Sequence, residues 1–369
     1  MDYQGIEIVC PACRSDLTRE GNDREGTLAC TSCANDYPII AGIPDLRLWP
    51  DPYIGLEADR VKGRMLDEHA AHLGFAAAVR FYYSVTEKVP PFQAQRFERS
   101  LLAAAPRARH SLEQWEHEAG GDAAKLTLLE IGCGTAPLLQ AAALQYRQVV
   151  GIDVAFRWLI LARRRFADEG IHAPLLCACA EALPFPDAVF DRVVADSAIE
   201  HLRSPEESLR ECARVMRAGA WLMGATPNRF SLGPDPHVGL PAGGYLPNGV
   251  ISTYVRRKGG IPPKRQLQSI GSLHRLLDEA GFEGISIWAP EVPTQQVQGF
   301  GAAVRTGVRI YNRVLGLGPA RFLFNRIGPL LHLVARREAS GPVPVPVTSP
   351  DESTLRPTSA SAPPARARD

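Results

Sequence analysis

The chain has 369 residues, of which 45% are hydrophobic and 22% are charged. This is the composition of a folded globular protein, and the length suffices for two or three domains. The formal net charge is +1, which excludes a chain-wide positive field for binding nucleic acid. No signal peptide is recognisable, and no apolar run reaches the roughly 20 residues of a membrane-spanning helix. We therefore expect a cytoplasmic protein, or one at the membrane periphery.

Residues 1–48 contain two Cys-x-x-Cys pairs, Cys10 with Cys13 and Cys30 with Cys33, separated by 16 residues. Two such pairs place four thiolates around one tetrahedral ion, at about 2.3 Å each. Because so short a segment can form only a small hydrophobic core, metal binding would supply much of its folding free energy. The alternative, two disulfides, requires an oxidising compartment. We expect a structural zinc ribbon.

Residues 49–120 are rich in Ala, Arg and Glu, with aromatic residues interspersed, and they predict helices. The helix expected over 57–82 has Phe81, Tyr82 and Tyr83 at its end. These side chains either cap a site or pack against the neighbouring domain.

Residues 121–290 alternate short runs of Val, Leu and Ile with helical stretches, which predicts an α/β fold with a parallel sheet. The expected strands are 126–131, 148–153, 173–178, 190–195, 220–225 and 284–288. The expected helices are 137–146, 156–167, 205 to about 219, and 273–280. At the start of the third helix, Ser204 suits the N-cap, Pro205 the first turn, and Glu207 completes a capping box.

The segment LLEIGCGTAPLL at 128–139 runs from a strand into a glycine turn at Gly132 and Gly134, where the backbone can approach a ligand closely. Asp153 ends the next strand, so its carboxylate lies at the same sheet edge and can accept two ribose hydroxyls. A dinucleotide site would place a glycine where Pro137 stands. Glu130 would repel a pyrophosphate, but it can hold the cationic end of an amino-acid moiety. The two acids therefore favour S-adenosylmethionine over NAD.

On these residues the sequence resembles the class I S-adenosylmethionine-dependent methyltransferases, in the type 11-like subgroup of small-molecule enzymes. The resemblance also includes AEALPF at 180–185, the Phe-Asp pair at 190–191, DSAIEHL at 196–202 and RVMRAG at 214–219. It implies a Rossmann-like seven-stranded sheet with helices on both faces. By position, it places these residues in or beside the cofactor pocket: Glu130, Gly132, Cys133, Gly134, Asp153, Val154, Ala180, Glu181 and Asp196. One departure is Ala136, where the family usually has a third glycine.

The stretch 37–46 after the second Cys pair is similar to the zinc-ribbon activator subunit of eukaryotic and archaeal methyltransferases and to its short bacterial relatives. This resemblance implies an activator or stabiliser within the chain rather than a reader of nucleic acid.

The loop 226–247 is long, rich in Gly and Pro, and follows the fifth strand directly, a place where loops are frequently functional. His237 is the candidate general base for an oxygen acceptor, and the alternative is a hydrogen bond that orders the loop. His201 is a second candidate base, or a packing residue on the cofactor side. Asn228 and Arg229 are candidate substrate residues, because an arginine can pair with a carboxylate or phosphate.

Residues 291–340 are predicted as a basic, apolar helical segment, since 292–337 holds seven arginines and no Asp or Glu. This segment is either a helical lid or a basic amphipathic surface that contacts an anionic membrane or a lipid-linked acceptor. Residues 341–369 are rich in Pro, Ser and Ala and predict disorder.

The predicted function is methyl transfer from S-adenosylmethionine to a small molecule, a sugar or a lipid-linked glycan, on oxygen. One alternative is an RNA base methyltransferase, because some rRNA guanine methyltransferases carry an N-terminal zinc ribbon. The near-zero net charge opposes it. Another alternative is a non-catalytic scaffold with a vestigial methyltransferase domain. The sequence favours no particular oligomeric state.

Overall fold

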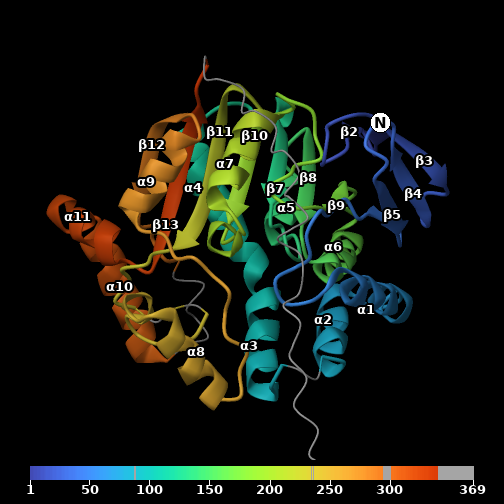
Figure 1. Cartoon of the computed structure of the whole chain (residues 1–369). Coiled ribbons are helices and arrows are strands. Elements are labelled where there is room, and N and C mark those ends of the chain that lie inside the picture. Colours follow the sequence, from blue (N-terminus) through green and yellow to red (C-terminus); the bar gives the residue numbers. More distant parts are fainter. Residues whose placement is uncertain (87–88, 234, 236, 294–300, 340–369) are drawn as a thin grey trace, which may run out of the picture.

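A central β-sheet organises the molecule (Figure 1). A computed structural model describes residues 1–86, 89–233, 235, 237–293 and 301–339. The segment expected to be disordered, 341–369, lies outside these residues. Within them, seven strands form the sheet in the order β12-β13-β11-β10-β7-β8-β9, and β13 runs antiparallel to both of its neighbours. This mixed sheet confirms the Rossmann-like α/β fold. The strands are β7 (Thr127–Ile131), β8 (Gln148–Asp153), β9 (Leu175–Cys177), β10 (Phe190–Asp196), β11 (Met216–Pro227), β12 (Phe282–Trp288) and β13 (Leu330–Arg337).

Strand β13 corrects the expectation that 291–340 is helical throughout. The helical prediction agrees with α10 (Ala302–Leu315) and α11 (Gly318–Ile327), but it is wrong for the eight residues of β13, which insert between β11 and β12. The run LHLVA, residues 331–335, is buried on both faces of the sheet. A short, continuously apolar run has no periodicity that separates a buried strand from a helix.

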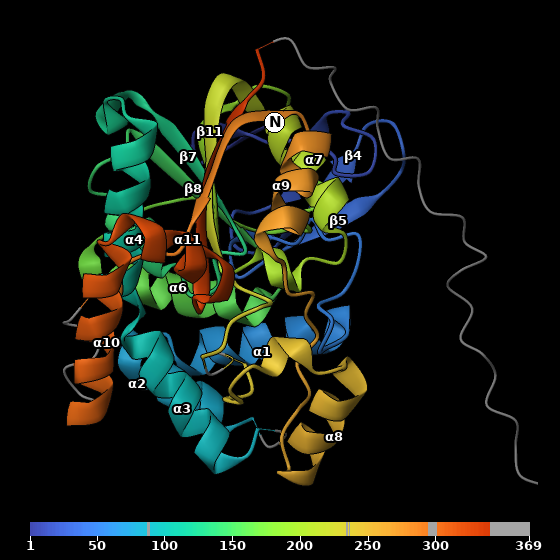
Figure 2. The ribbon, with the colours of Figure 1, turned by 90° about the vertical axis from the view of Figure 1, so that its left-hand side faces the viewer.

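Helices cover both faces of the sheet (Figures 1 and 2). On one face, α7 (Pro205–Val215) and α9 (Ile270–Glu279) share a hydrophobic core with the N-terminal module. The other face carries a core formed with these helices: α1 (Leu56–His69), α2 (Phe75–Ser84), α4 (Ala104–Ala119), α5 (Pro137–Ala142) and α6 (Phe156–Glu169). The helix expected over 57–82 is thus two helices, α1 and α2. The helix α3 (Pro91–Leu102) follows them.

The N-terminal module is built from short antiparallel strands. Its hairpin pairs β1 (Asp2–Tyr3) with β2 (Ile6–Glu7), and its small sheet follows the order β3-β4-β5-β6. The bounds of that sheet are β3 (Leu17–Gly21), β4 (Gly26–Cys30), β5 (Asp36–Ile40) and β6 (Ile43–Pro44). The module joins the central sheet at its β9 edge, where the backbone nitrogen of Leu46 donates to the carbonyl of Cys177 at 2.7 Å. Arg14 also pairs with Glu211 of α7 at 3.0 Å.

Helix α7 begins where the sequence predicted, but its capping differs. The Ser204 hydroxyl accepts a hydrogen bond from the backbone nitrogen of Glu207 at 3.3 Å. The backbone nitrogen of Ser204 donates to Glu181 Oε1 at 3.1 Å, so Glu181 takes the role that a capping box gives to Glu207. The helix ends at Val215 rather than near Gly219, and β11 begins at once.

The loop after β11 contains structure that the sequence did not indicate. A short 3-10 turn, Gly243–Tyr245, leads into α8 (Asn248–Arg257). Two further 3-10 turns cover Ala123–Lys125 and Ile199–His201. Among the described residues, no helix combines the length and hydrophobicity needed to cross a membrane.

Candidate active site

The glycine turn between β7 and α5 requires residues without a side chain. Gly132 and Gly134 have φ values of +65° and +53°, and a Cβ on Gly132 would lie 2.7 Å from the Cβ of Ala198. Ala136, at the place of the third glycine, adopts φ +56° at the N-cap of α5 and is fully buried. An alanine accepts this left-handed conformation at a cost of about 1–2 kcal/mol. The turn therefore keeps its shape without the third glycine.

Asp153 ends β8 beside this turn. Its Oδ2 accepts a hydrogen bond from the backbone nitrogen of Gly134, and its Oδ1 from that of Ala155, both at 2.7 Å. Burial raises the pKa of Asp153 to about 6, although the two backbone donors act in the opposite direction. Each oxygen keeps a further lone pair, so the carboxylate can accept hydroxyl donors from a ligand.

Two more acids lie behind the turn. Glu130 is buried, and among the described residues its Oε2 finds no hydrogen-bond partner. Burial, together with the negative charges of Asp196 and Asp153, raises the pKa of Glu130 well above its usual range. Burial likewise raises the pKa of Asp196 to about 6. Neighbouring acids with raised pKa values form a site that a cationic ligand would stabilise.

A cavity of about 710 Å³ opens at the carboxyl edge of the sheet over this turn. Six residues predicted for the cofactor line it: Gly132, Gly134, Asp153, Val154, Ala180 and Glu181. The other three, Glu130, Cys133 and Asp196, are not among its lining residues. Cys133 is buried behind the turn, against Gly151.

The outer wall of this cavity is a segment that the sequence analysis did not single out. We call residues 49–53, Trp-Pro-Asp-Pro-Tyr, the strap; all five line the cavity. The guanidinium of Arg203 lies over the Trp49 ring, 4.6 Å from its centroid. Two prolines and a tryptophan directly after the predicted ribbon are the signal that identifies such a rigid covering segment.

A buried network of charges holds the strap against β8. Arg47 donates to Asp45 at 2.7 Å, to Asp59 of α1 at 2.8 Å and to the carbonyl of Val154 at 2.8 Å. Arg157 of α6 pairs with the same Asp59 at 2.9 Å and with Asp51 of the strap at 3.2 Å. The exposed fraction of these side chains is 9% or less. The network thus ties the N-terminal module, the strap and the cavity floor together.

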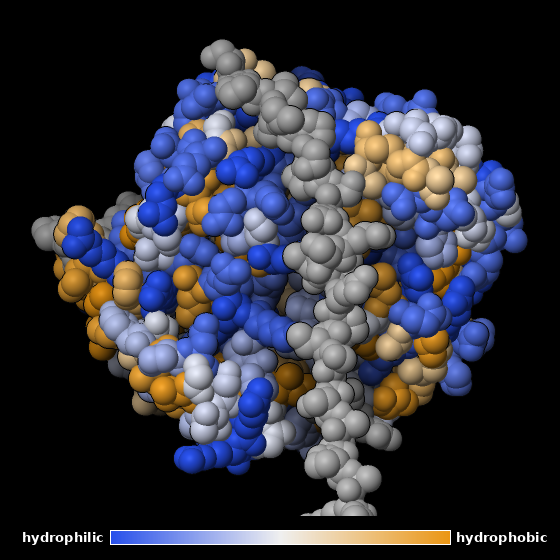
Figure 3. Space-filling view, in the orientation of Figure 1, coloured by the Kyte–Doolittle hydropathy of each residue, from blue (hydrophilic) through white to orange (hydrophobic). Residues whose placement is uncertain are grey.

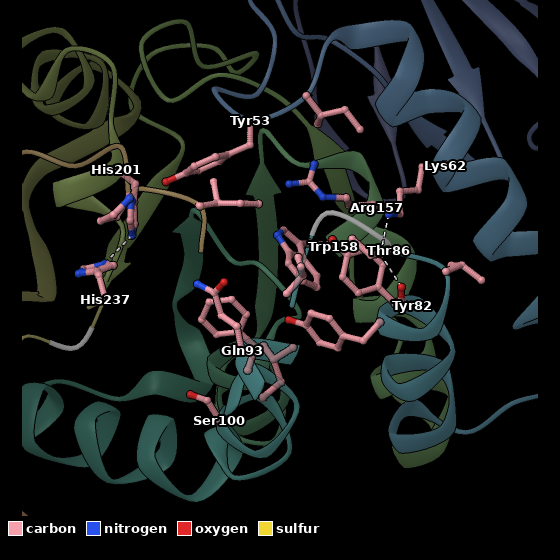
Figure 4. A pocket seen from close by; sticks show the side chains of 18 residues that line it. Tyr53, Lys62, Tyr82, Thr86, Gln93, Ser100, Arg157, Trp158, His201 and His237 are labelled. Atoms are coloured by element: carbon pink, nitrogen blue, oxygen red, sulfur yellow. Dashed lines mark hydrogen bonds between the residues drawn. The ribbon is translucent and has the colours of Figure 1, made fainter. Parts of the chain in front are cut away.

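A second cavity, of about 660 Å³, adjoins the first (Figure 4). Its walls are largely apolar and include five aromatic side chains: Tyr53, Tyr82, Tyr83, Phe97 and Trp158. Four residues line both cavities: Tyr53, Arg157, Trp158 and His201. Aromatic walls with a few polar groups are typical of sites for small organic ligands.

His201 and His237 meet in the wall of this second cavity, with their Nε2 atoms 3.0 Å apart (Figure 4). Lys264 offers only a carbonyl to His201 Nδ1 at 3.2 Å, so that nitrogen carries the proton and Nε2 accepts. Arg265 can only donate to His237 Nδ1, at 2.9 Å, so the proton of His237 sits on Nε2. The geometry therefore assigns the lone pair between the rings to His201.

Glu200 lies beside both histidines. Its Oε1 is 4.0 Å from Nε2 of His201 and of His237, and its Oε2 accepts from the Thr226 hydroxyl at 3.0 Å. Burial raises the pKa of Glu200 to about 7. Burial lowers the pKa of His201, and the charge of Arg265 acts in the same direction. The three side chains place potential metal ligands within 4.8 Å of one another, but a proton on His237 Nε2 opposes coordination there.

The two predicted substrate residues are not in either cavity wall. Asn228 is buried, and its amide donates to the carbonyls of Arg326 at 2.9 Å and Gly328 at 3.0 Å. Its side-chain oxygen accepts from the backbone nitrogen of Phe230 at 3.0 Å, so the whole amide is used to fasten the loop. Arg229 is exposed, with its guanidinium 5.8 Å from the Phe230 ring.

The four predicted metal ligands converge in the N-terminal module. The sulfur atoms of Cys10, Cys13, Cys30 and Cys33 all lie within 4.8 Å of one another. The shortest separations are 3.4 Å for Cys13 to Cys30 and 3.6 Å for Cys10 to Cys33. Backbone amides and the side chains of Tyr37 and Asn35 point donors at these sulfurs, as second-shell groups do at a thiolate site.

The comparisons with known proteins agree with this geometry. Residues 129–224 match a family model described as "Methyltransferase domain". This stretch of the chain is thus similar to methyltransferase domains. The ubiquinone biosynthesis O-methyltransferase of Chromobacterium violaceum is 34% identical over 104 residues, which are 28% of this chain and 44% of that protein. The Bordetella avium protein of the same name is 30% identical over 117 residues, 31% of this chain and 48% of that protein. The chain thus matches less than half the length of these relatives.

Solved structures of methyltransferases are similar at low identity. A phosphoethanolamine N-methyltransferase of Haemonchus contortus has a TM-score of 0.43 at 15% identity, covering 63% of this chain and 52% of that chain. An S-adenosylmethionine-dependent methyltransferase of Mesorhizobium loti has a TM-score of 0.43 at 16% identity, covering 64% and 98%.

Most residues of the second cavity lie outside the matched part of the methyltransferase domain. They come from the strap, from helices α1 to α3 and from the segment after α8. The run Phe81-Tyr82-Tyr83 was a usable signal, since two of its three rings line the cavity. Trp158 lies five residues after Asp153, the residue predicted to hold the ribose. Helical periodicity alone does not show whether such a side chain lines a cavity or packs in the core.

Proposed function

We propose that this protein transfers a methyl group from S-adenosylmethionine to a hydroxyl oxygen of a small, apolar, ring-bearing molecule. The main support for this proposal is the pair of adjoining cavities, with His201 in the wall that they share. One cavity has the acids and glycine turn of a cofactor site, and the other has the aromatic walls of an acceptor site. The O-methyltransferase names of the relatives support oxygen as the acceptor atom.

The residues of the first cavity fit the cofactor. The unpartnered Oε2 of Glu130 and the raised pKa values of the acids suit a ligand with a positive charge. Asp153 would hold the ribose hydroxyls, and the open backbone at Gly132 and Gly134 would lie against the amino-acid end. When bound, the cofactor supplies an electrophilic methyl carbon on a sulfonium.

The residues of the second cavity orient the acceptor and receive its proton. Tyr82, Trp158 and Phe97 would pack against a ring, and the hydroxyl would point to the boundary between the cavities. His201 is the proposed base, because its Nε2 carries no proton and its lowered pKa keeps it neutral. The acceptor hydroxyl would replace His237 as the donor to this nitrogen. His237 was the candidate base from the sequence; we propose it as a positioning residue, since its Nε2 proton holds His201 until the acceptor binds.

We also propose that the N-terminal module is a ribbon that binds one structural zinc ion. Tetrahedral Zn²⁺ with Zn–S distances of about 2.3 Å requires sulfur atoms roughly 3.8 Å apart, close to those observed. Elemental analysis of the purified chain should find one zinc per chain. A folded chain without metal would contradict this assignment.

Two measurements test the proposed activity. Calorimetry should show binding of S-adenosylmethionine that Asp153→Ala abolishes, with Leu144→Ala, an exposed residue that lines neither cavity, as the control. Labelled cofactor should then transfer its methyl group to members of a panel of phenols and other ring alcohols, each compared with its hydroxyl-free analogue. Cofactor binding without transfer to any hydroxyl compound or RNA fraction would favour the scaffold, and transfer to RNA alone the RNA methyltransferase.

A further inference from the structure

The positive charge of this nearly neutral chain is concentrated in two segments. Residues 228–277 and 301–337 together hold fourteen basic residues and one acidic residue, against 41 and 40 in the whole chain. The single acid, Asp235, is buried and paired with Arg265. The rest of the chain is therefore acidic, and the molecule is electrically polarised.

Exposed apolar side chains gather in the same two segments. Among the described residues, ten of the sixteen large hydrophobic side chains that are exposed belong to 230–250 or 304–323. Three of them lie in or beside α11: Phe322 is 64% exposed, Leu317 59% and Leu323 53%. Figure 3 shows apolar and hydrophilic atoms interleaved over α10 and α11 at the margin of the molecule. Apolar side chains that cluster on a surface mark an interaction site.

The loop after β11 and the end of α11 lie side by side. The backbone nitrogen of Leu232 donates to the carbonyl of Ile327 at the end of α11, at 3.2 Å, and Asn228 bonds the carbonyls of Arg326 and Gly328. We call the following set the basic apolar face: Phe230, Leu232, Ile310, Leu317, Phe322 and Leu323, with the exposed Arg309, Arg313 and Arg326.

Helices α10 and α11, which carry most of this face, pack against each other. Tyr311 of α10 meets Phe324 of α11 edge to face, with ring centroids 5.1 Å apart, and Leu315 is buried. Tyr311 also donates to the carbonyl of Pro290 at 3.0 Å. The pair is thus anchored to the domain by its inner side, while the side chains of the basic apolar face point outward.

We propose that the basic apolar face binds the surface of an anionic phospholipid bilayer. Aliphatic and aromatic side chains would enter the boundary between headgroups and acyl chains, and the arginines would pair with lipid phosphates. The aliphatic character of Leu232, Ile310, Leu317 and Leu323 favours lipid over RNA, because bases stack on aromatic rings. A second copy of the chain is disfavoured, since a symmetric contact would oppose arginine to arginine.

The position of this face connects it to the second cavity. The loop that presents Phe230 and Leu232 continues to His237 in the cavity wall. Docking would therefore bring the acceptor cavity toward the lipid surface. The docking itself does not depend on the proposed reaction, and its test uses no turnover.

Vesicle flotation with the full chain tests the docking. Vesicles of phosphatidylcholine with about one-third phosphatidylglycerol should carry the protein upward, whereas vesicles of phosphatidylcholine alone should not. Arg309→Ala should lower the partition coefficient about fivefold, and Arg309→Ala with Arg313→Ala more steeply. Phe322→Ser with Leu323→Ser should abolish flotation. Leu144→Ser, which removes a 74% exposed leucine outside the face, should leave it unchanged.

Several outcomes would overturn the proposal. They are failure of the wild-type chain to float, equal flotation with neutral vesicles, and equal loss with Leu144→Ser. Binding of a single-stranded RNA homopolymer in place of vesicles would assign the face to nucleic acid. Concentration-dependent dimerisation that Phe322→Ser with Leu323→Ser abolishes, in sedimentation analysis, would assign it to a second copy. Circular dichroism and cofactor calorimetry establish that each variant is folded.

Discussion

At the residue scale, the site depends on acids whose ionisation is unfavourable until a cation arrives. Asp153 and Asp196 each have a pKa raised to about 6 by burial, and Glu130 is raised further. A cationic ligand favours the ionised carboxylates, so its binding lowers these pKa values and releases protons. The free carboxylates are protonated below their pKa, and affinity falls there.

The ionisation of Asp153 and Asp196 should therefore make the affinity for S-adenosylmethionine fall as pH decreases below about 6, by up to tenfold per pH unit for each carboxylate that must ionise, and the contribution of these two acids should be flat above about 7. Calorimetry between about pH 5 and pH 8 measures this. Asp153→Asn should bind weakly at every pH and show a shallower dependence. A wild-type affinity that does not change with pH would contradict the assignment.

The histidine pair gives a second prediction at this scale. His201→Ala should lower kcat by about 10²- to 10⁴-fold, because it removes the proposed base. The dissociation constant of the cofactor should change little. His237→Ala should lower kcat less than His201→Ala and should shift the acid limb of the pH–rate profile, since His201 loses the donor on its Nε2. Equal rates for wild type and His201→Ala would remove His201 as the base.

The sequence predicted the acids and the glycine turn because both belong to one short continuous stretch whose geometry is local. It singled out both histidines but did not indicate which of them has an unprotonated Nε2. That assignment depends on Arg265 and Lys264, which are more than 25 residues away along the chain. Asn228 and Arg229, the predicted substrate residues, line neither cavity. A polar residue after a strand has the same sequence signature whether it fastens a loop or contacts a ligand. Of the aromatic wall, the sequence indicated only Tyr82 and Tyr83, because Tyr53, Phe97 and Trp158 come from separate elements.

At the scale of elements, the strap is held by a buried charge network rather than by apolar packing alone. Removing one member of such a network leaves its partners with buried charges that nothing neutralises. The loss in folding stability is then larger than the stability that the intact network contributes. Arg47 contacts Asp45 and Asp59 with no exposed side-chain surface on any of the three.

Arg47→Ala should therefore lower the free energy of unfolding by about 3–5 kcal/mol. It should also weaken cofactor binding, because Arg47 bonds the Val154 carbonyl and the strap covers the cavity. Denaturant titration and calorimetry measure the two effects. Arg19→Ala, which removes an exposed pair in the N-terminal module, is the matched control and should change neither quantity appreciably. A stable Arg47→Ala chain would show that the network is dispensable.

The strand β13 gives a second prediction for the elements. Leu333 is fully buried between β11 and β12, so Leu333→Ala should cost about 2–5 kcal/mol of unfolding free energy. Leu323→Ala in the neighbouring α11 is 53% exposed and should cost less than about 0.5 kcal/mol. Thermal or denaturant unfolding compares them. Equal costs would argue against the insertion of β13 in the sheet.

At the scale of the whole molecule, a methyltransferase sheet is enclosed by parts that the matched family region lacks. The ribbon shares a hydrophobic core with α7 and α9, the strap covers one cavity, and the helices α1 to α3 enclose the other. Residues 129–224 were predictable in outline because their motifs have fixed spacing. The enclosing parts have no such spacing, so their positions follow only from three-dimensional packing.

The continuity from ribbon to strap has a consequence for how two ligands influence each other. If zinc orders the ribbon and thereby the strap, then zinc raises the affinity for the cofactor, and the coupling must hold equally in reverse. Saturation with S-adenosylmethionine should then make the metal harder to extract with a chelator, by the same factor by which extraction weakens the binding of S-adenosylmethionine. Zinc release followed with a colorimetric chelator measures that factor, and an unchanged extraction would show that the two sites act independently. A protein with such reciprocity would retain its zinc most firmly while its cofactor site is occupied.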